Sequence, residues 1–234
     1  MQNFIENSPT QLPSSPVKSA AIVPGERQEA PLNTLENFYY TEVEKFLAVK
    51  NPFILDLGCG GQSIFSSTYF AKQKIIAVDR DEGLIARAPK DHVTYYCMNV
   101  GEIIWQNRFD LALDSHLFHC LTETDERESF LFNIHRSLRP GAIFALETMA
   151  AHKGMKFSSD YYYAANKTLY QQSTMRPLRK ILSAWEIEQS LLKYFDLLVF
   201  KIFVDNKFLL QGNGQEFLAT EPDVLRIVCV KKSE

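Results

Sequence analysis

A glycine-rich segment that begins with an acidic residue carries the clearest chemical signal in the sequence. Residues 56–63 read Asp-Leu-Gly-Cys-Gly-Gly-Gln-Ser and follow a short apolar run. Glycines such as Gly58 and Gly60 let the backbone pass close beneath a ligand, with N–H groups directed at it. Asp79 ends the next apolar run, 21 positions after Gly58, where a carboxylate can accept hydrogen bonds from both hydroxyls of a ribose. The pattern predicts a site for a cofactor that contains adenosine.

The same loop distinguishes between two classes of such cofactor. Dinucleotide oxidoreductases generally carry a third glycine beside the pyrophosphate, and this chain has Ser63 at that position. Asp56, two residues before the first glycine, is also unfavourable beside a pyrophosphate, whereas a ligand with a cationic amino or sulfonium group tolerates it. The loop therefore favours S-adenosylmethionine over NAD, and an NAD-dependent oxidoreductase ranks third among the interpretations.

Two histidines follow a later apolar run. Asp114 directly follows the apolar run of residues 109–113, and His116 and His119 come shortly after Asp114. Histidine can accept a proton near neutral pH, and transfer of a methyl group to a hydroxyl, thiol or ammonium acceptor requires a proton to leave. We predict that one of them is the catalytic base. His116 is nearer the strand end, and His119 shares its face if the segment is helical. The alternative is that a histidine only packs against, or caps, the following helix.

Short apolar runs predict the strands that position these side chains. Several of them are separated by helical patterns, which is typical of a parallel sheet covered on both faces. The five runs span residues 52–57, 74–78, 93–97, 109–113 and 141–147, and two further strands at 197–204 and 224–230 are expected to form an antiparallel hairpin. One helix is expected to begin at Asn33 and another to follow the glycine-rich segment. Two more are expected over 124–138 and from Ser183 or Ala184.

Ordered motifs along residues 33–231 resemble the class I S-adenosylmethionine-dependent methyltransferases. Residues 54–60 resemble the first motif of that family, 77–80 the second, 98–101 the third, 109–120 the fourth, and 138–142 the stretch before its fifth strand. The resemblance implies a Rossmann-like, doubly wound α/β fold. Its seven-stranded sheet would be mostly parallel, with the last strand antiparallel and the ligand at the carboxyl ends of the strands.

The resemblance also implies roles for individual residues. Asp79 would bind the ribose. Asn99 stands where the family commonly has an aspartate that contacts the adenine amino group, and its side-chain oxygen can still accept. The backbone N–H of Val100 would meet a ring nitrogen of adenine, and Asp114 would contact the methionine portion. The predicted cofactor-binding residues are Asp56, Gly58, Cys59, Gly60, Asp79, Arg80, Asn99, Val100 and Asp114.

A metal site is the weaker interpretation of Asp114. Together with Glu147 it could bind magnesium, as in the metal-dependent catechol-type methyltransferases. Two carboxylates without an obvious third partner make a poor magnesium site, so no metal is predicted.

Composition divides the chain into an N-terminal segment and one folded domain. Residues 1–32 contain five of the ten prolines and are expected to be a flexible tail or a lid. Residues 33–234 form the predicted methyltransferase domain, with a tyrosine-rich insert at 151–182 that would cover the acceptor.

Charge and cysteine usage narrow the class of protein further. A net charge of −3 argues against a nucleic-acid partner. No apolar run approaches the roughly 20 residues that span a membrane, and no secretory signal is recognisable. The four cysteines form no C-x-x-C pair, which favours reduced thiols in the cytoplasm.

The sequence as a whole predicts methyl transfer from S-adenosylmethionine to a small-molecule acceptor, with S-adenosylhomocysteine released. A protein or peptide methyltransferase is the first alternative. The second is a catalytically inactive S-adenosylmethionine-binding protein that acts through partners.

Overall fold

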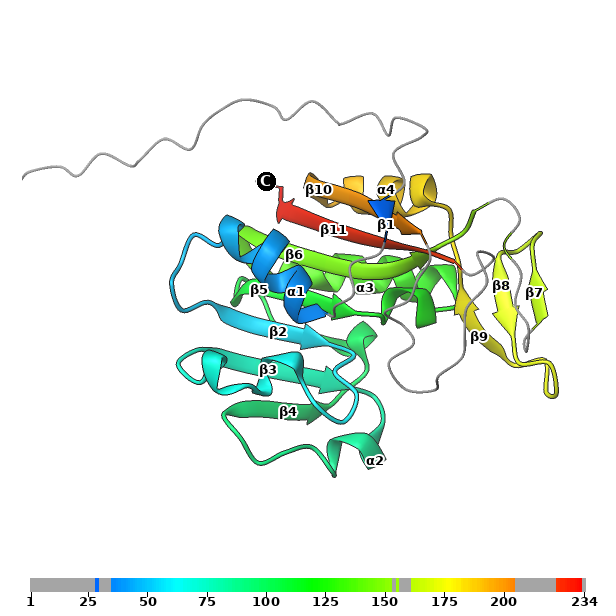
Figure 1. The fold of residues 1–234 in the computed structure, drawn as a ribbon. Helices are drawn as coiled ribbons and strands as arrows, with labels where there is room; N and C mark the ends of the chain where they lie inside the picture. Colours follow the sequence, from blue (N-terminus) through cyan, green and yellow to red (C-terminus); the bar gives the residue numbers. More distant parts are fainter. Residues whose placement is uncertain (1–27, 30–34, 153–154, 156–160, 205–221, 233–234) are drawn as a thin grey trace, which may run out of the picture.

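The computed structural model describes residues 28–29, 35–152, 155, 161–204 and 222–232, and its centre is one twisted sheet (Figure 1). The strands of this sheet lie in the order β1-β10-β11-β6-β5-β2-β3-β4. They are β1 (Gln28–Glu29), β2 (Phe53–Leu57), β3 (Lys74–Asp79), β4 (Val93–Cys97), β5 (Phe109–Ser115), β6 (Leu138–Ala150), β10 (Phe195–Val204) and β11 (Asp223–Lys231).

Strand directions confirm the predicted Rossmann-like topology. The five strands β4, β3, β2, β5 and β6 pair in parallel, whereas β11 is antiparallel to both of its neighbours, β6 and β10. The last strand of the chain is therefore the antiparallel one, as expected. The two-residue strand β1 adds an eighth member beside β10. It belongs to the segment expected to be a tail or lid, and the remainder of residues 1–32 lies outside the described part of the chain.

Two separate hydrophobic cores cover the two faces of the sheet, because side chains alternate along each strand. Leu55, Leu57 and Phe144 point to the face covered by α3 (Thr124–Ser137) and α4 (Ala184–Leu192). The opposite face, with Ile54 and Leu111, is covered by α1 (Leu35–Phe38) and the turns after it (Figure 1). Burial on both faces explains why these strands read as nearly continuous apolar runs.

The first predicted helix is present but broken into three short pieces. The α1 helix passes directly into a π-helical turn at Tyr39–Val43 and then into a 3₁₀ turn at Glu44–Phe46. Another four-residue helix, α2 (Glu82–Ile85), follows β3.

The prediction of a regular helix after the glycine-rich segment is wrong. Two 3₁₀ turns, Ile64–Ser66 and Thr68–Phe70, take its place. The hydroxyl of Ser63 accepts the N–H of Phe65, which tightens the chain at the point where a helix would begin. Phe65 and Phe70 are then buried edge-on against the ring of Tyr39, so aromatic packing holds these turns on the sheet.

The tyrosine-rich insert forms a second, smaller sheet. Its three antiparallel strands are β7 (Tyr161–Tyr163), β8 (Thr168–Tyr170) and β9 (Pro177–Lys180). This sheet lies beyond the carboxyl ends of β2 and β5 (Figure 1), and β9 packs against a 3₁₀ turn at Phe118–Cys120. Among the helices that the structure describes, none has the length and apolar character needed to cross a membrane.

Candidate active site

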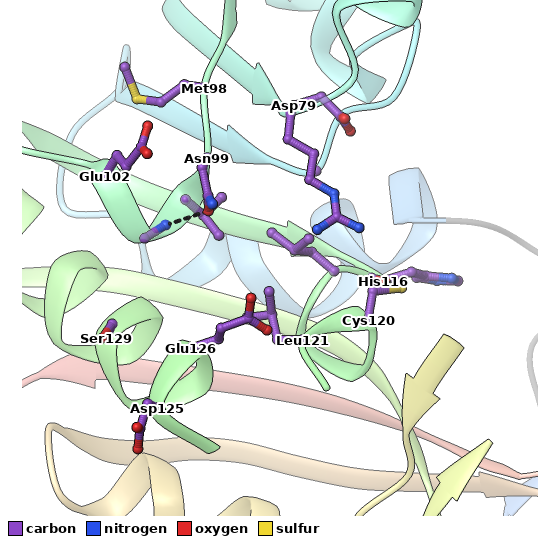
Figure 2. A pocket seen from close by; sticks show the side chains of 15 residues that line it. Asp79, Met98, Asn99, Glu102, His116, Cys120, Leu121, Asp125, Glu126 and Ser129 are labelled. Atoms are coloured by element: carbon purple, nitrogen blue, oxygen red, sulfur yellow. Dashed lines mark hydrogen bonds between the residues drawn. The ribbon is translucent and has the colours of Figure 1, made fainter. Parts of the chain in front are cut away.

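A cavity of about 550 Å³ opens at the carboxyl ends of β2, β3, β4 and β5 (Figure 2). Six residues singled out in the sequence line it, namely Gly58, Asp79, Arg80, Asn99, Val100 and His116. Among those not singled out are Leu117 and Leu121, which contribute apolar walls, and Glu102, Asp125 and Glu126, which contribute carboxylates. The structure thus brings the ends of four strands to one ligand-sized space.

The glycine-rich loop is held against β3 by backbone hydrogen bonds. The N–H groups of Gly58 and Cys59 both donate to the carbonyl of Val78, at 2.9 and 3.1 Å. The N–H of Gly60 donates to Oδ2 of Asp79 at 2.9 Å, and Oδ1 of Asp79 accepts the N–H of Asp81 at 2.9 Å. The Asp79 carboxylate is therefore fixed between the loop and the start of α2.

Gly58 has no room for a side chain. Its φ is +71°, and a Cβ built there would lie 2.9 Å from Cβ of Leu117. Leu117 itself lines the cavity, so the bare backbone of Gly58 and the Leu117 side chain are packed against each other at the cavity wall.

The side chains of Asp56 and Cys59 do not line the cavity. Asp56 is fully buried and accepts the hydroxyl of Ser63 at 2.6 Å. Burial raises the pKa of the Cys59 thiol to about 12, and that thiol donates to the carbonyl of Gly60. Gly60, with φ of +60°, is likewise outside the lining. These three residues shape the loop from beneath.

Asn99 caps a 3₁₀ turn at Val100–Glu102 on the opposite wall. Its Oδ1 accepts the N–H of Gly101 at 3.0 Å, the bond drawn in Figure 2. The N–H of the preceding residue, Met98, donates to the carbonyl of Asp79. Asn99 and Asp79 are therefore positioned relative to each other by the backbones that carry them.

Asp114 ends inside the protein rather than in the cavity. It is fully buried, and its two oxygens accept the N–H groups of Leu117 and Phe118 at 2.6 and 2.9 Å. Burial raises its pKa to about 8, although the two backbone hydrogen bonds act in the opposite direction. Asp114 thus forms the turn that carries His116.

The raised pKa of Asp114 makes a prediction about stability. The folded protein holds a proton here between pH values of about 4 and 8 that the unfolded chain releases, so stability should fall as pH rises, by up to about 1.4 kcal/mol per pH unit. Asp114→Asn cannot ionise and should flatten this slope, although it loses one of the two acceptors for the N–H groups of Leu117 and Phe118. Urea unfolding at several pH values measures the effect, and parallel slopes in the two proteins would contradict it.

His116 lies at one end of the cavity. Its side chain lies near Cys120, and Met98 and Glu102 lie at the opposite end (Figure 2). The imidazole Nε2 is 2.6 Å from Oε1 of Glu147, and the backbone N–H of His116 donates to the Glu147 carbonyl at 3.2 Å. The backbone of His116 has a left-handed φ of +69°, which is uncommon for a residue other than glycine.

His119 is separated from the cavity by burial. Its Nδ1 accepts the N–H of Met149 at 3.4 Å and lies 3.1 Å from the hydroxyl of Thr148. Burial holds its pKa well below the usual range for histidine. The side chain is therefore neutral and acts as a packed, hydrogen-bonded part of the interior.

Glu147 and Arg226 form an ion pair that the motifs did not indicate. Oε2 of Glu147 accepts Nε of Arg226 at 2.5 Å, with both side chains only 1% exposed. Glu147 was considered only as a magnesium ligand beside Asp114, and both carboxylates instead accept from protein donors. A single arginine within the apolar run of residues 224–230 is the signal that could have indicated a buried partner. Within the described segments, no cluster of three metal-ligating side chains was found.

Residues 55–146 match the family model of a methyltransferase domain. This match supports the predicted family and enzyme class. A comparison with curated proteins found no match.

Solved structures of similar fold include an S-adenosylmethionine-dependent methyltransferase from Methanosarcina mazei, 15% identical over 82% of this chain and 98% of that one, with a TM-score of 0.61. A second such enzyme, from Mesorhizobium loti, is 18% identical over 83% and 98%, with a TM-score of 0.58. The 1,6-didemethyltoxoflavin N1-methyltransferase of Burkholderia thailandensis, solved with S-adenosylhomocysteine, is 18% identical over 88% and 94%, with a TM-score of 0.56. At these identities the likeness establishes the fold alone.

The close contact at Gly58 makes a prediction about the cofactor. Gly58→Ala should destabilise the domain by about 1–3 kcal/mol and weaken binding of S-adenosylhomocysteine about tenfold or more, because the loop must shift away from Leu117. Gly61→Ala is the matched control, since a Cβ there meets nothing closer than 3.8 Å. Calorimetric titration of both variants measures the difference, and equal affinities would contradict the assigned role.

Proposed function

We propose that this methyltransferase transfers a methyl group from S-adenosylmethionine to a small molecule, with His116 as the general base. The observation that carries the proposal is the placement of His116. It lines the same cavity as the Gly58 loop and Asp79, at the end away from Met98, and it is backed by a buried carboxylate. Other histidines that the structure describes, such as His119, do not line this cavity.

The residues present suit the cofactor. The cavity lining includes four carboxylates, from Asp79, Glu102, Asp125 and Glu126, against the one guanidinium of Arg80, which favours a cationic ligand. Asp79 would hold the ribose, since each of its oxygens has lone-pair capacity beyond the backbone bond it accepts. Asn99 and Val100 would hold the adenine, with the Asn99 oxygen shared between Gly101 and the ligand.

His116 would take the proton that the acceptor loses. Bound S-adenosylmethionine supplies an already activated methyl group. A hydroxyl, thiol or ammonium acceptor must lose a proton as it is methylated, and a neutral imidazole can accept that proton at physiological pH. The apolar side chains of Leu117 and Leu121 would exclude water from the reacting groups.

Five of the residues predicted for the site would act without touching the ligand. Asp56, Cys59 and Gly60 would support the glycine-rich loop. Asp114 would hold the turn that carries His116, and His119 would pack beneath that turn. We therefore narrow the residues that touch the cofactor to Gly58, Asp79, Arg80, Asn99 and Val100.

Three observations favour a small acceptor over a protein or peptide. A cavity of about 550 Å³ is of the size that takes cofactors and small ligands. The small sheet of the insert packs beside the turn that bears Cys120, at the His116 end. The structurally similar Burkholderia enzyme is named for a small heterocyclic acceptor, which supports the same class here.

We also propose a cytoplasmic location, because all four cysteines are free thiols.

An acceptor screen with methyl-labelled S-adenosylmethionine tests the proposal, once calorimetry has shown that the protein binds the cofactor. Panels of phenols, thiols, amines and nitrogen heterocycles are compared with peptide mixtures. Transfer to a small molecule is the expected result. Transfer to peptides alone would contradict the proposed acceptor class. Cofactor binding with no transfer to any panel would instead support the inactive, partner-binding alternative.

A further inference from the structure

Behind His116, a line of charged groups runs from the cavity into the interior. Nε2 of His116 lies 2.6 Å from Oε1 of Glu147, and the other oxygen of Glu147 accepts Nε of Arg226 at 2.5 Å. The His116 side chain is 28% exposed, whereas the side chains of Glu147 and Arg226 are 1% exposed. The line therefore begins at the cavity and ends in the protein core.

Arg226 is held in place from several sides. Glu147 on β6 and Arg226 on β11 are direct partners in the register of these antiparallel strands. The guanidinium lies 5.3 Å from the ring of Phe38 and 5.4 Å from that of Phe203, and its Nη1 donates to Oδ1 of Asn37. The arginine cannot turn away from Glu147 without losing these contacts.

Stability alone does not explain a buried ion pair of this kind. The free-energy cost of removing two charges from water often exceeds the gain from their attraction, and apolar residues of similar size often stabilise a fold equally well. Here the carboxylate also contacts a histidine that lines the cavity, and the backbone carbonyl of the same residue accepts the N–H of His116. Glu147 thus controls both the ring and the backbone of His116, which holds a left-handed φ of +69°.

Hydrogen-bonding capacity then determines the tautomer. An arginine can only donate, and a carboxylate can only accept. The oxygen of Glu147 that faces His116 must therefore accept a hydrogen bond from Nε2–H, which leaves the basic lone pair of a neutral imidazole on Nδ1. We propose that Glu147, held by Arg226, is a positioning residue that keeps His116 in the Nε2–H tautomer, with Nδ1 as the nitrogen that accepts the proton of the methyl acceptor. This inference rests on the proposed role of His116 as the base.

Nitrogen-15 NMR of histidine-labelled protein in the presence of S-adenosylhomocysteine tests the tautomer without any acceptor. The chain has five histidines, and His116→Asn identifies the signals of His116 by their loss. We expect the wild-type imidazole in the Nε2–H form. A wild-type signal in the Nδ1–H form would overturn the proposal without any variant of Glu147.

Glu147→Gln supplies the decisive comparison. The amide must turn its oxygen to Arg226, so its NH₂ group faces His116 and requires Nε2 to accept. We expect the signal to change to the Nδ1–H form, with the affinity for S-adenosylhomocysteine changed less than about threefold. Glu42→Gln is the matched control, because Glu42 also pairs with a cation, Lys201, but does not line the cavity. An unchanged tautomer in folded Glu147→Gln would overturn the proposal.

Turnover separates this inference from the proposed function. On an acceptor from the screen, Glu147→Gln should lower kcat about 100- to 10,000-fold with little change in KM for the cofactor, the pattern of a base held in the wrong tautomer. A changed tautomer with undiminished kcat would leave Glu147 as the positioning residue but refute His116 as the base. Arg226→Lys retains the positive charge and a donor for Glu147, and should therefore retain the wild-type tautomer.

Discussion

Replacing His116 with asparagine should lower the rate constant for methyl transfer by about 100- to 10,000-fold, the range expected when a general base is removed. Binding of S-adenosylhomocysteine should change less than about threefold, because His116 lies at the end of the cavity away from Asn99. Asparagine suits the position, since it tolerates the left-handed φ of +69° that His116 adopts. Loss of activity would then reflect lost chemistry rather than a disturbed backbone.

The comparison requires a histidine variant that leaves the cavity intact. His92→Asn meets this requirement, because His92 bonds to the carbonyl of Phe65 and does not line the cavity. Single-turnover rates measured with saturating S-adenosylmethionine separate transfer from binding. Wild-type rates in His116→Asn would contradict its role as the base, and would point to an acceptor such as a free carboxylate, which needs no proton removed.

Replacing Asp79 with alanine should weaken binding of S-adenosylhomocysteine by about 100-fold or more. The substitution removes the oxygens that hold the N–H groups of Gly60 and Asp81, and with them the proposed partner of the ribose. Hydrogen bonds to a charged group contribute roughly 1.5–3 kcal/mol each, so loss of even one or two reaches this size. Asp79→Asn keeps one accepting oxygen and should weaken binding by about tenfold.

Asp81→Asn is the control for Asp79. The Asp81 side chain caps α2 by accepting the N–H of Leu84, and asparagine caps a helix equally well. Calorimetric titration gives the affinities, and the rise in thermal midpoint with added ligand provides an independent measure. If Asp79→Ala binds S-adenosylhomocysteine as tightly as Asp81→Asn does, Asp79 does not bind the ribose.

The parallel strands β2 and β3 were predictable because they are buried on both faces. Residues 53–57 and 74–79 are apolar runs that end at a glycine and at an acid, and both became strands within a residue or two of the expected bounds. The long helix α3 was equally clear from its periodic apolar face and from the Arg139-Pro140-Gly141 segment after it. By contrast, the turns after the glycine-rich loop depend on Ser63 and on aromatic packing with Tyr39, a residue from a distant part of the chain.

Residues at the ends of strands were identifiable in the sequence for a simple physical reason. The carboxyl ends of parallel strands meet at one edge, so the residues directly after each run, such as Gly58, Asp79 and Asn99, gather there. Their chemical types already matched a loop beneath a ligand, an acceptor for ribose hydroxyls and a polar cap. What the sequence could not separate was a residue that lines the cavity from one that supports it, as with Asp56 and Asp114.

By itself, then, the sequence determined the order of the main strands, predicted the cofactor class and identified His116 as a candidate base. Only the tertiary structure shows that His116 lines the cavity whereas His119 is buried, because the burial of His119 against Met149 depends on the packing of η6, the turn at Phe118–Cys120, on β6. It also paired Glu147 with Arg226. These residues are 79 positions apart, and they meet because β6 and β11 are neighbours in one register. Periodicity reports which face of a strand is buried, but not which side chains face each other across the sheet.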